Sequence, residues 1–218
     1  GKDTYIRENI NTTFGNSAVI RLGNLTSRDN RGLIEFNISN ISAGNTIISA
    51  KLQVYINSSA GSANRTINIY RLTSAWNESS TNWANRTYSE LWSTAGGDYN
   101  GTELDSVNFT NSSGTYYNFS ILTAVRGWID GSYENFGVIL MSPNTKNGNY
   151  TDISSSNSET ANQRPMIIIE YTGNTFPTIN NISTDSSLAS PKQIGQQINF
   201  TINWTDLEGN PSQVFVCN

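Results

Sequence analysis

The sequence predicts an all-β protein, a jelly-roll β-sandwich with one short helix, followed by a second, partial β-sandwich. Two observations support this. About ten short runs of β-branched and aromatic residues are separated by turn residues roughly every eight to twelve positions, and a single segment has helical periodicity. The shortage of helices excludes a parallel α/β architecture. We expect the first sandwich to occupy residues 1–173 and an incomplete second module to occupy residues 174–218.

The first strands are predicted from short apolar patterns. Asp3–Glu8 and Ser17–Gly23 are β-prone runs separated by a Gly-Asn turn. In Arg31–Ser39 every second residue is apolar, which places Leu33 and Asn37 on the outward face of a strand.

The longest stripe of alternating apolar residues comes next. Its members are Ile48, Ala50, Leu52, Val54 and Ile56. This alternation indicates an antiparallel strand with one buried and one solvated face. Because Arg65–Thr73 follows a turn rich in Ser and Gly, we expect it to pair with this stripe as a hairpin.

The next segment, residues 76–111, contains three Trp and two Gly-rich turns but little periodicity. A loop of this length in a compact domain is usually functional or packed into the sandwich. After it we expect a strand at Tyr116–Phe119 and a helix that Ser120 caps and that ends before Gly131. The apolar positions of this helix are Ile121, Val125, Trp128 and Ile129.

The run Arg164–Thr172, RPMIIIEYT, is apolar and bounded by Pro and Gly. Such a run predicts a strand buried on both faces, in the middle of a sheet. Phe136–Ser142 has the same character, and Tyr150–Ser155 is a further strand between the two. We expect Arg164–Thr172 to seal the first sandwich.

Polar character comes from Asn, Ser and Thr, which number 31, 28 and 23, rather than from charge. Random placement would give about seven Asn-x-Ser/Thr triplets, whereas the chain has sixteen. We therefore expect a heavily N-glycosylated protein. The acceptors are Asn11, Asn24, Asn37, Asn40, Asn57, Asn64, Asn77, Asn85, Asn100, Asn108, Asn111, Asn118, Asn149, Asn181, Asn199 and Asn203.

Composition also limits partners and compartment. The formal charge of −4 with no basic cluster argues against nucleic acid as a partner. No apolar run approaches the ~20 residues that span a bilayer. The single Cys217 excludes an internal disulfide framework. With the sequons, these features favour an extracellular or cell-surface protein whose secretory signal has been removed.

The N-terminal motif and later segments carry a resemblance to a known family. Residues 3–8, DTYIRE, match three letters of the motif D-N-R-L-R-E, and matching segments continue in order to the closing NQRPMIIIEYT. Asp3–Thr172 therefore resembles the disaggregatase-related repeat. The resemblance implies a non-catalytic jelly-roll module of archaeal and bacterial surface proteins, similar to carbohydrate-binding modules. It also implies a structural role for Asp3, Arg7 and Glu8, as an ion-pair lock.

From Pro177 the chain resembles the opening of an immunoglobulin-like repeat. An immunoglobulin sandwich needs about seven strands, and about three are expected here. Two interpretations remain open: the sequence covers part of a longer domain, or a neighbouring subunit completes the module by strand complementation. The candidate assembly residues are Ile198, Phe200, Ile202, Trp204, Val214 and Val216.

The absence of His excludes Ser-His-Asp triads and His-based zinc sites, and we expect no catalytic residues and no enzymatic activity.

Two ligand sites are considered, each against a structural alternative. Trp76, Trp83, Trp92 and Tyr99 would form a sugar-stacking platform or, as the favoured reading, pack under the long loop. Asp98, Asn100, Asp206 and Glu208 are calcium candidates, with ordinary polar turns favoured, and we expect no other cofactor.

Two functions follow from these observations. The first is a non-catalytic, glycosylated surface or adhesion protein that self-associates through residues 174–218, as a filament or sheath subunit. The alternative is a carbohydrate-binding module of a larger secreted or cell-surface protein.

Overall fold

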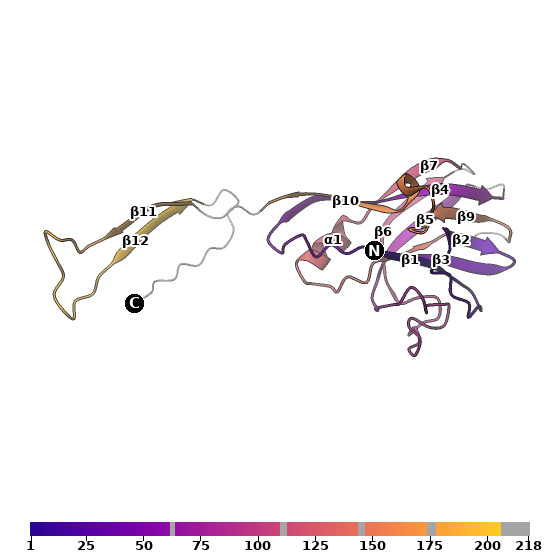
Figure 1. The fold of residues 1–218 in the computed structure, drawn as a ribbon, viewed down its shortest axis with the longest axis horizontal. Coiled ribbons are helices and arrows are strands. Elements are labelled where there is room, and N and C mark those ends of the chain that lie inside the picture. Colours follow the sequence, from indigo (N-terminus) through magenta and orange to yellow (C-terminus); the bar gives the residue numbers. More distant parts are fainter. Residues whose placement is uncertain (62–63, 110–112, 144–146, 174–177, 206–218) are drawn as a thin grey trace. The chain divides into compact units, whose positions relative to one another are not determined.

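The computed structural model describes residues 1–61, 64–109, 113–143, 147–173 and 178–205. The chain divides into two compact units, Gly1–Thr172 and Gly173–Asn218. The first unit is an antiparallel jelly roll with one α-helix, which confirms the predicted fold class (Figure 1).

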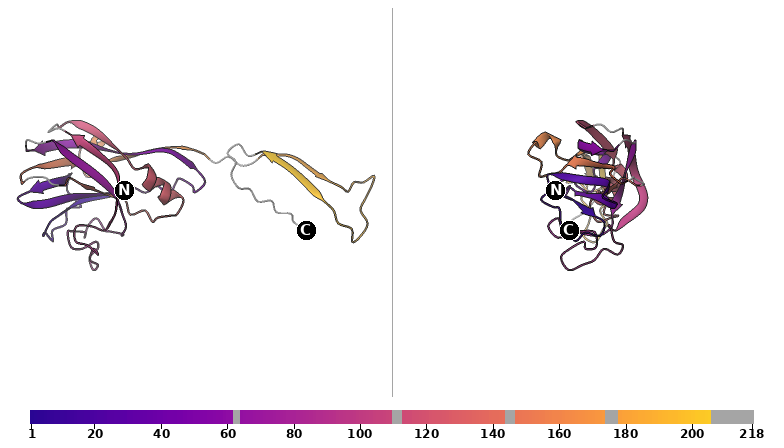
Figure 2. Two further views of the ribbon diagram at one scale, coloured as in Figure 1. Left: turned by 180° about the vertical axis from the view of Figure 1, so that it is seen from behind. Right: turned by 90° about the vertical axis from the view of Figure 1, so that its right-hand side faces the viewer.

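Ten strands of the first unit form one curled sheet in the order β10-β4-β9-β2-β3-β8-β5-β6, with β1 beside β3 and β7 beside β4. The right-hand view of Figure 2 shows the strands of the first unit curling around a common interior. The strands are β1 (Lys2–Arg7), β2 (Val19–Leu25), β3 (Arg28–Glu35), β4 (Thr46–Ala60), β5 (Arg65–Leu72), β6 (Tyr99–Phe109), β7 (Thr115–Ser120), β8 (Val138–Met141), β9 (Tyr150–Ser154) and β10 (Met166–Thr172).

The interior contains two apolar clusters. The larger one fills the sandwich and includes Leu52, Phe119 and Ile153, all fully buried. The smaller one lies against the long 73–98 segment and includes Leu33 and Trp76. Leu33 was expected on the outward face, but this second cluster covers the other side of β3, so both faces of that strand are buried there.

A β-bulge shifts the apolar stripe of β4. Ala50, Leu52, Val54 and Ile56 are buried as predicted, but Ile48 is 48% exposed and Ile47 is buried in its place. The register explains this correction, since Ser49 pairs with Glu170 and Ile47 pairs with Tyr171. The unpaired Ile48 breaks the alternation.

The expected hairpin between β4 and Arg65–Thr73 is wrong. Strand β5 lies between β6 and β8 instead. Around Lys51, β4 already has a neighbour on each side, because Lys51 pairs with Ile168 of β10 and with Ser120 of β7. Near its end β4 also pairs with β9, so the chain crosses to another part of the sheet before β5 begins.

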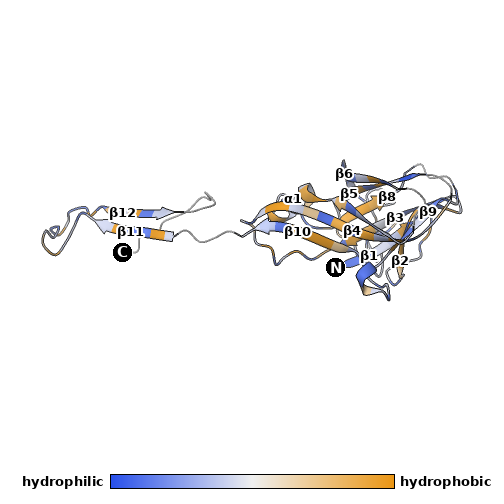
Figure 3. Cartoon of the chain, turned by 90° about the horizontal axis from the view of Figure 1, so that it is seen from above, coloured by the Kyte–Doolittle hydropathy of each residue, from blue (hydrophilic) through white to orange (hydrophobic). Residues whose placement is uncertain are grey.

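Strand β10 is an edge strand, which corrects its predicted place in the middle of the sheet. In the described structure its one paired neighbour is β4. Ile167 and Ile169 pack on the core, whereas Met166 and Ile168 are 47% and 41% exposed. The isoleucine run therefore has one solvated face. Figure 3 shows the apolar colouring on part of β10.

Helix α1 (Leu122–Ile129) lies where the periodicity predicted it, and Ala124 and Val125 are buried. The predicted cap is wrong: Ile121 occupies the N-cap position without a side-chain hydrogen bond, and Ser120 is the last residue of β7. Gly131 follows the helix with a φ of 79°, as expected of a helix C-terminus. A short 3-10 helix spans Ala161–Gln163.

In the second unit, β11 (Thr178–Thr184) and β12 (Phe200–Thr205) pair as an antiparallel ribbon. Ile179 lies opposite Trp204 and Ile182 lies opposite Ile202. The predicted positions Asn111, Asp206, Glu208, Val214, Val216 and Cys217 lie outside the described residues. Among the described helices, none has the length and apolar character needed to cross a membrane.

Candidate functional site

Two of the four predicted sugar-stacking residues are buried. Trp76 and Trp92 are 3% and 4% exposed. Their indole N–H groups donate to the carbonyl oxygens of Phe136 and Asn82, at 2.9 and 3.0 Å. Both rings therefore fasten the long loop to the second apolar cluster, as the structural alternative expected, and neither offers a face to a ligand.

Trp83 and Tyr99 are partly exposed. The guanidinium of Arg31 lies 4.7 Å from the ring centre of Trp83, in cation–π geometry, and donates to the carbonyl of Gly96 at 2.9 Å. Gly96 has a φ of 95°, and a Cβ there would come within 2.8 Å of the Trp83 ring. Trp83 is thus held as one wall of the loop rather than as a free platform.

Tyr99 lines an open cavity of about 490 Å³ at the base of the long loop. Its lining is rich in hydroxyl groups, which come from Thr73, Ser74, Ser93, Thr94 and Tyr99. Gly97, Asp98 and Gly101 complete the lining. Such a lining could hydrogen-bond a sugar. Sugar binding by Tyr99 and Trp83 stays a prediction.

The carboxylate of Asp98 organises this loop. It accepts hydrogen bonds from the backbone N–H groups of Ser93 and Thr94, at 3.0 and 2.9 Å, and from the hydroxyl of Ser74, at 3.0 Å. Burial pushes the pKa of Asp98 upward, but these donors outweigh burial and hold it below its usual value.

The calcium candidates Asp98 and Asn100 already serve the backbone. Asn100 Oδ1 accepts the N–H of Thr102 at 2.9 Å, as in an ordinary polar turn. Within the described ranges, no group of three or more Asp, Glu, His or Cys side chains is placed to hold a metal ion. Calcium binding at Asp98 and Asn100 stays untested.

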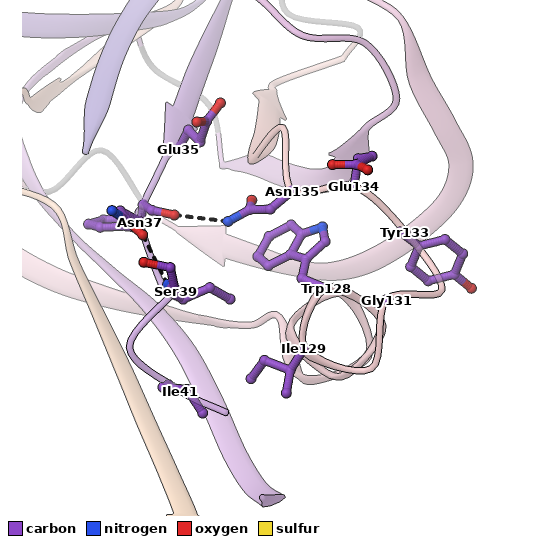
Figure 4. A pocket seen from close by; sticks show the side chains of 12 residues that line it. Glu35, Asn37, Ser39, Ile41, Trp128, Ile129, Gly131, Tyr133, Glu134 and Asn135 are labelled. Carbon is purple, nitrogen blue, oxygen red and sulfur yellow. Dashed lines mark hydrogen bonds between the residues drawn. The ribbon is translucent and has the colours of Figure 1, made fainter. Parts of the chain in front are cut away.

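A second, larger cavity of about 570 Å³ lies between the C-terminal end of α1 and the segment after β3. In Figure 4, Trp128 of the helix lies between Asn135 and Ile129, across from Asn37 and Ser39. The cavity is lined by Glu35, Phe36, Asn37, Ile38, Ser39, Ile41, Trp128, Ile129, Gly131, Tyr133, Glu134 and Asn135. It thus combines three aromatic rings, those of Phe36, Trp128 and Tyr133, with carboxylate and amide groups.

Local contacts fix the walls of the Trp128 cavity. The Tyr133 ring packs on Gly127, where a Cβ would lie 2.2 Å from the ring, and Arg71 covers its face at 4.0 Å. Asn135 donates to the carbonyl of Phe36 at 2.9 Å and accepts the N–H of Gly137 at 3.0 Å. The segment that follows the helix is therefore tied to the end of β3.

Charge in the Trp128 cavity is partly compensated. Glu35 forms a 3.0 Å ion pair with Lys2, whose ammonium also lies 4.5 Å from the ring centre of Trp76. Glu134 is exposed. The indole N–H of Trp128 is buried without a hydrogen-bond partner in the described part of the chain, although buried Trp N–H groups usually have one.

A comparison with protein-family models finds carbohydrate-binding module family 96, matched over residues 1–171. The chain belongs to this family. Family 96 is a family of non-catalytic binding modules, which agrees with the absence of catalytic residues expected from the sequence. A search of curated proteins found no match.

The family match confirms the coarser part of the predicted resemblance, a carbohydrate-binding type of β-sandwich. The disaggregatase-related repeat and the archaeal origin stay predictions. The ion-pair lock inferred from that resemblance does not form: Arg7 donates to Thr26 and to the Leu25 carbonyl, while Glu8 accepts the N–H of Asp29 at 3.1 Å. Asp3 accepts the N–H of Ser156 at 2.7 Å instead.

The predicted glycosylation sites occupy surface positions. Of the fifteen acceptors in the described ranges, twelve are exposed and three, Asn24, Asn85 and Asn149, are half-buried. Asn181 and Asn203 lie directly opposite each other on β11 and β12. Glycan attachment itself stays a prediction.

The sequence analysis missed the Trp128 cavity. The sequence predicts Trp128 on the apolar face of the helix, and its ring does pack on the core. The same ring also lines the cavity. The missed signal was the segment Gly131–Asn135, in which Tyr133, Glu134 and Asn135 place an aromatic, a carboxylate and an amide directly after a helix.

Proposed function

We propose that residues 1–172 bind carbohydrate at the Trp128 cavity, as the non-catalytic module of an extracellular or cell-surface protein. The observation that carries the proposal is the juxtaposition of Trp128 and Tyr133 with Glu35 and Glu134 around one cavity of about 570 Å³. Membership of a carbohydrate-binding family supports the same class of ligand.

The chemistry of a sugar ring fits this arrangement. A pyranose has apolar C–H faces, which pack on aromatic rings, and hydroxyl edges, which need donors and acceptors. Trp128 supplies the ring, and the carboxylate of Glu134 can accept hydroxyl protons. Asn135 is already committed at both ends and serves to shape the wall.

Binding can be tested by calorimetry against a panel of soluble oligosaccharides. Tyr133→Ala removes a 42% exposed ring from the Trp128 cavity, and we expect it to weaken binding by about tenfold, or ~1.4 kcal/mol. Tyr99→Ala is the matched control, because it removes the same side chain from the other cavity. Loss of binding with Tyr99→Ala and retention with Tyr133→Ala would move the site to the long loop.

The sequons support an extracellular, N-glycosylated protein, since most acceptors are exposed. Intact-mass measurement of native protein before and after removal of N-glycans tests this part. A native mass equal to that of the bare chain would contradict it.

A second candidate function, self-association as a surface or filament protein, rests on the β11–β12 ribbon. One face of the ribbon carries Ile179, Ile182, Phe200 and Trp204, which are 60%, 57%, 52% and 40% exposed. Exposed apolar faces of this kind commonly mark interfaces. The other face carries the cross-strand sequons Asn181 and Asn203.

Sedimentation velocity tests self-association directly. Oligomers that grow with concentration and disappear in Trp204→Ser are expected, because Trp204 is the largest side chain of that face. A monomer over the whole concentration range would rule out this function.

A further inference from the structure

A buried carboxylate in the first unit has one oxygen atom without a hydrogen-bond partner among the described residues. Asp3 on β1 is 3% exposed. Its Oδ2 accepts the N–H of Ser156 at 2.7 Å, but its Oδ1 is buried and has no hydrogen-bond partner in the described structure. Leaving a charged oxygen in this state is costly, because burial removes its hydration without replacing it.

A second carboxylate lies next to Asp3. Glu78, from the long loop, accepts the backbone N–H of Asp3 at 3.1 Å through Oε1. Burial raises the pKa of the Asp3 carboxyl to about 6, the hydrogen bonds from Ser156 oppose this shift, and the negative charge of Glu78 adds to it. Two negative groups from distant parts of the chain are thus brought together.

The basic side chains near the start of β1 are committed elsewhere. Lys2 pairs with Glu35 and donates to the carbonyl of Trp76. Arg21 binds both carboxylate oxygens of Asp152, at 2.7 and 2.8 Å. Neither neutralises the Asp3–Glu78 pair.

The segments that hold Asp3 and Glu78 carry a further oxygen atom and border an open cavity. Ser154 precedes Ser156 by two residues, and its hydroxyl is likewise buried without a partner among the described residues. Glu78 also lines an open cavity of about 360 Å³, together with Asn16, Ser17 and Asn157. The close approach of Glu78 to this cavity depends on Gly15, where a Cβ would lie 2.5 Å from the Glu78 carbonyl oxygen.

We propose that Asp3 and Glu78 bind a divalent cation of the calcium class, joining β1 to the long loop. Hard cations take carboxylate, hydroxyl and carbonyl oxygens as ligands, and calcium tolerates irregular geometry. The cation would satisfy Asp3 Oδ1 and neutralise the repulsion between the two carboxylates. This site is separate from Asp98 and from the Trp128 cavity, and it does not depend on the proposed sugar binding.

The proposal predicts that calcium binds to and stabilises the full chain. After treatment with EDTA, a titration with Ca²⁺ alone, followed by calorimetry and thermal unfolding, should show one site within the ~10⁻⁴–10⁻³ M range of extracellular modules. Saturation should raise the Tm by about 3 °C. Mg²⁺ should bind more weakly because it dehydrates reluctantly.

Three variants locate the cation. Glu78→Gln and Asp3→Asn should each weaken calcium binding by about tenfold or more. Glu90→Gln is the matched control, because Glu90 lies on the same loop but pairs with Arg86 at 2.9 Å. Since Glu78 is only half-buried, Glu78→Gln keeps the test decisive if Asp3→Asn fails to fold. No binding heat and no rise in Tm at about 5 mM Ca²⁺, or binding unchanged in Glu78→Gln, would overturn the proposal.

Discussion

Substitution of Asp3 by Asn should make the first unit more stable at neutral pH when divalent cations are removed. The pKa of Asp3 is raised from 3.8 to about 6, chiefly by burial. A raised pKa means that the folded state favours the protonated acid. The stabilising contribution of this proton is therefore complete below pH 3.8 and is lost as the pH rises through about 6.

The size of the effect follows from the shift. The difference between 6 and 3.8 is 2.2 pKa units, which corresponds to about 3 kcal/mol at 1.36 kcal/mol per unit. Asn cannot ionise, and its amide oxygen can still accept the N–H of Ser156. In EDTA, Asp3→Asn should thus exceed the wild type in unfolding free energy by up to ~3 kcal/mol at pH 7.5, with the difference vanishing near pH 4.

Urea unfolding followed by far-UV circular dichroism at several pH values between 4 and 7.5 measures this difference. The control is Glu103→Gln, which removes an exposed carboxylate of β6 and should give a small difference with little pH dependence. A stability difference for Asp3→Asn that stays constant across this pH range would refute the reasoning. So would a variant that is less stable than the wild type at pH 7.5 in EDTA.

Three further predictions concern the loop, the core and a turn. Asp98→Ala should cost about 1–3 kcal/mol in urea unfolding, because the N–H groups of Ser93 and Thr94 lose their acceptor; an unchanged midpoint would contradict this role. Leu52→Ala should cost about 2–5 kcal/mol, since it opens a cavity at a fully buried position; a cost below ~1 kcal/mol would mean that the core collapses around it. Gly137→Ala should lower the Tm, because Gly137 has a φ of 79° and a new Cβ would lie 2.1 Å from a backbone carbonyl oxygen; an unchanged Tm would show that this turn can shift.

The sequence predicted individual strands better than their neighbours. The alternation in β4 and the apolar run of β8 identified buried residues because side-chain direction depends on local pattern. The pairing of β4 with β10, β7 and β9 depends on contacts between distant segments, so local turn signals predicted the wrong hairpin. The bulge at Ile48 likewise leaves no local signal, because its neighbours Ile47 and Ser49 fit either register.

The candidate sites illustrate the same limit. Trp76 and Trp92 were candidates for sugar stacking because they are aromatic, and both are buried. The sequence alone does not distinguish an aromatic residue that binds a sugar from one that packs in the core. The Trp128 cavity forms where the end of α1 meets the segment after β3, about ninety residues apart in the chain, and no local motif encodes that meeting.

The long 73–98 segment illustrates how a stretch with almost no regular secondary structure can behave as part of the core. The rings of Trp76 and Trp92 are buried in the second apolar cluster, the Trp76 indole binds the carbonyl of Phe136, and Asp98 accepts N–H groups from within the segment. A protease that needs several residues of extended, detachable chain should therefore cut it slowly, in contrast to most long connections. For the same reason, peptide insertions meant to display a new epitope should be placed outside this segment, because lengthening it would disturb the packing of its buried tryptophans.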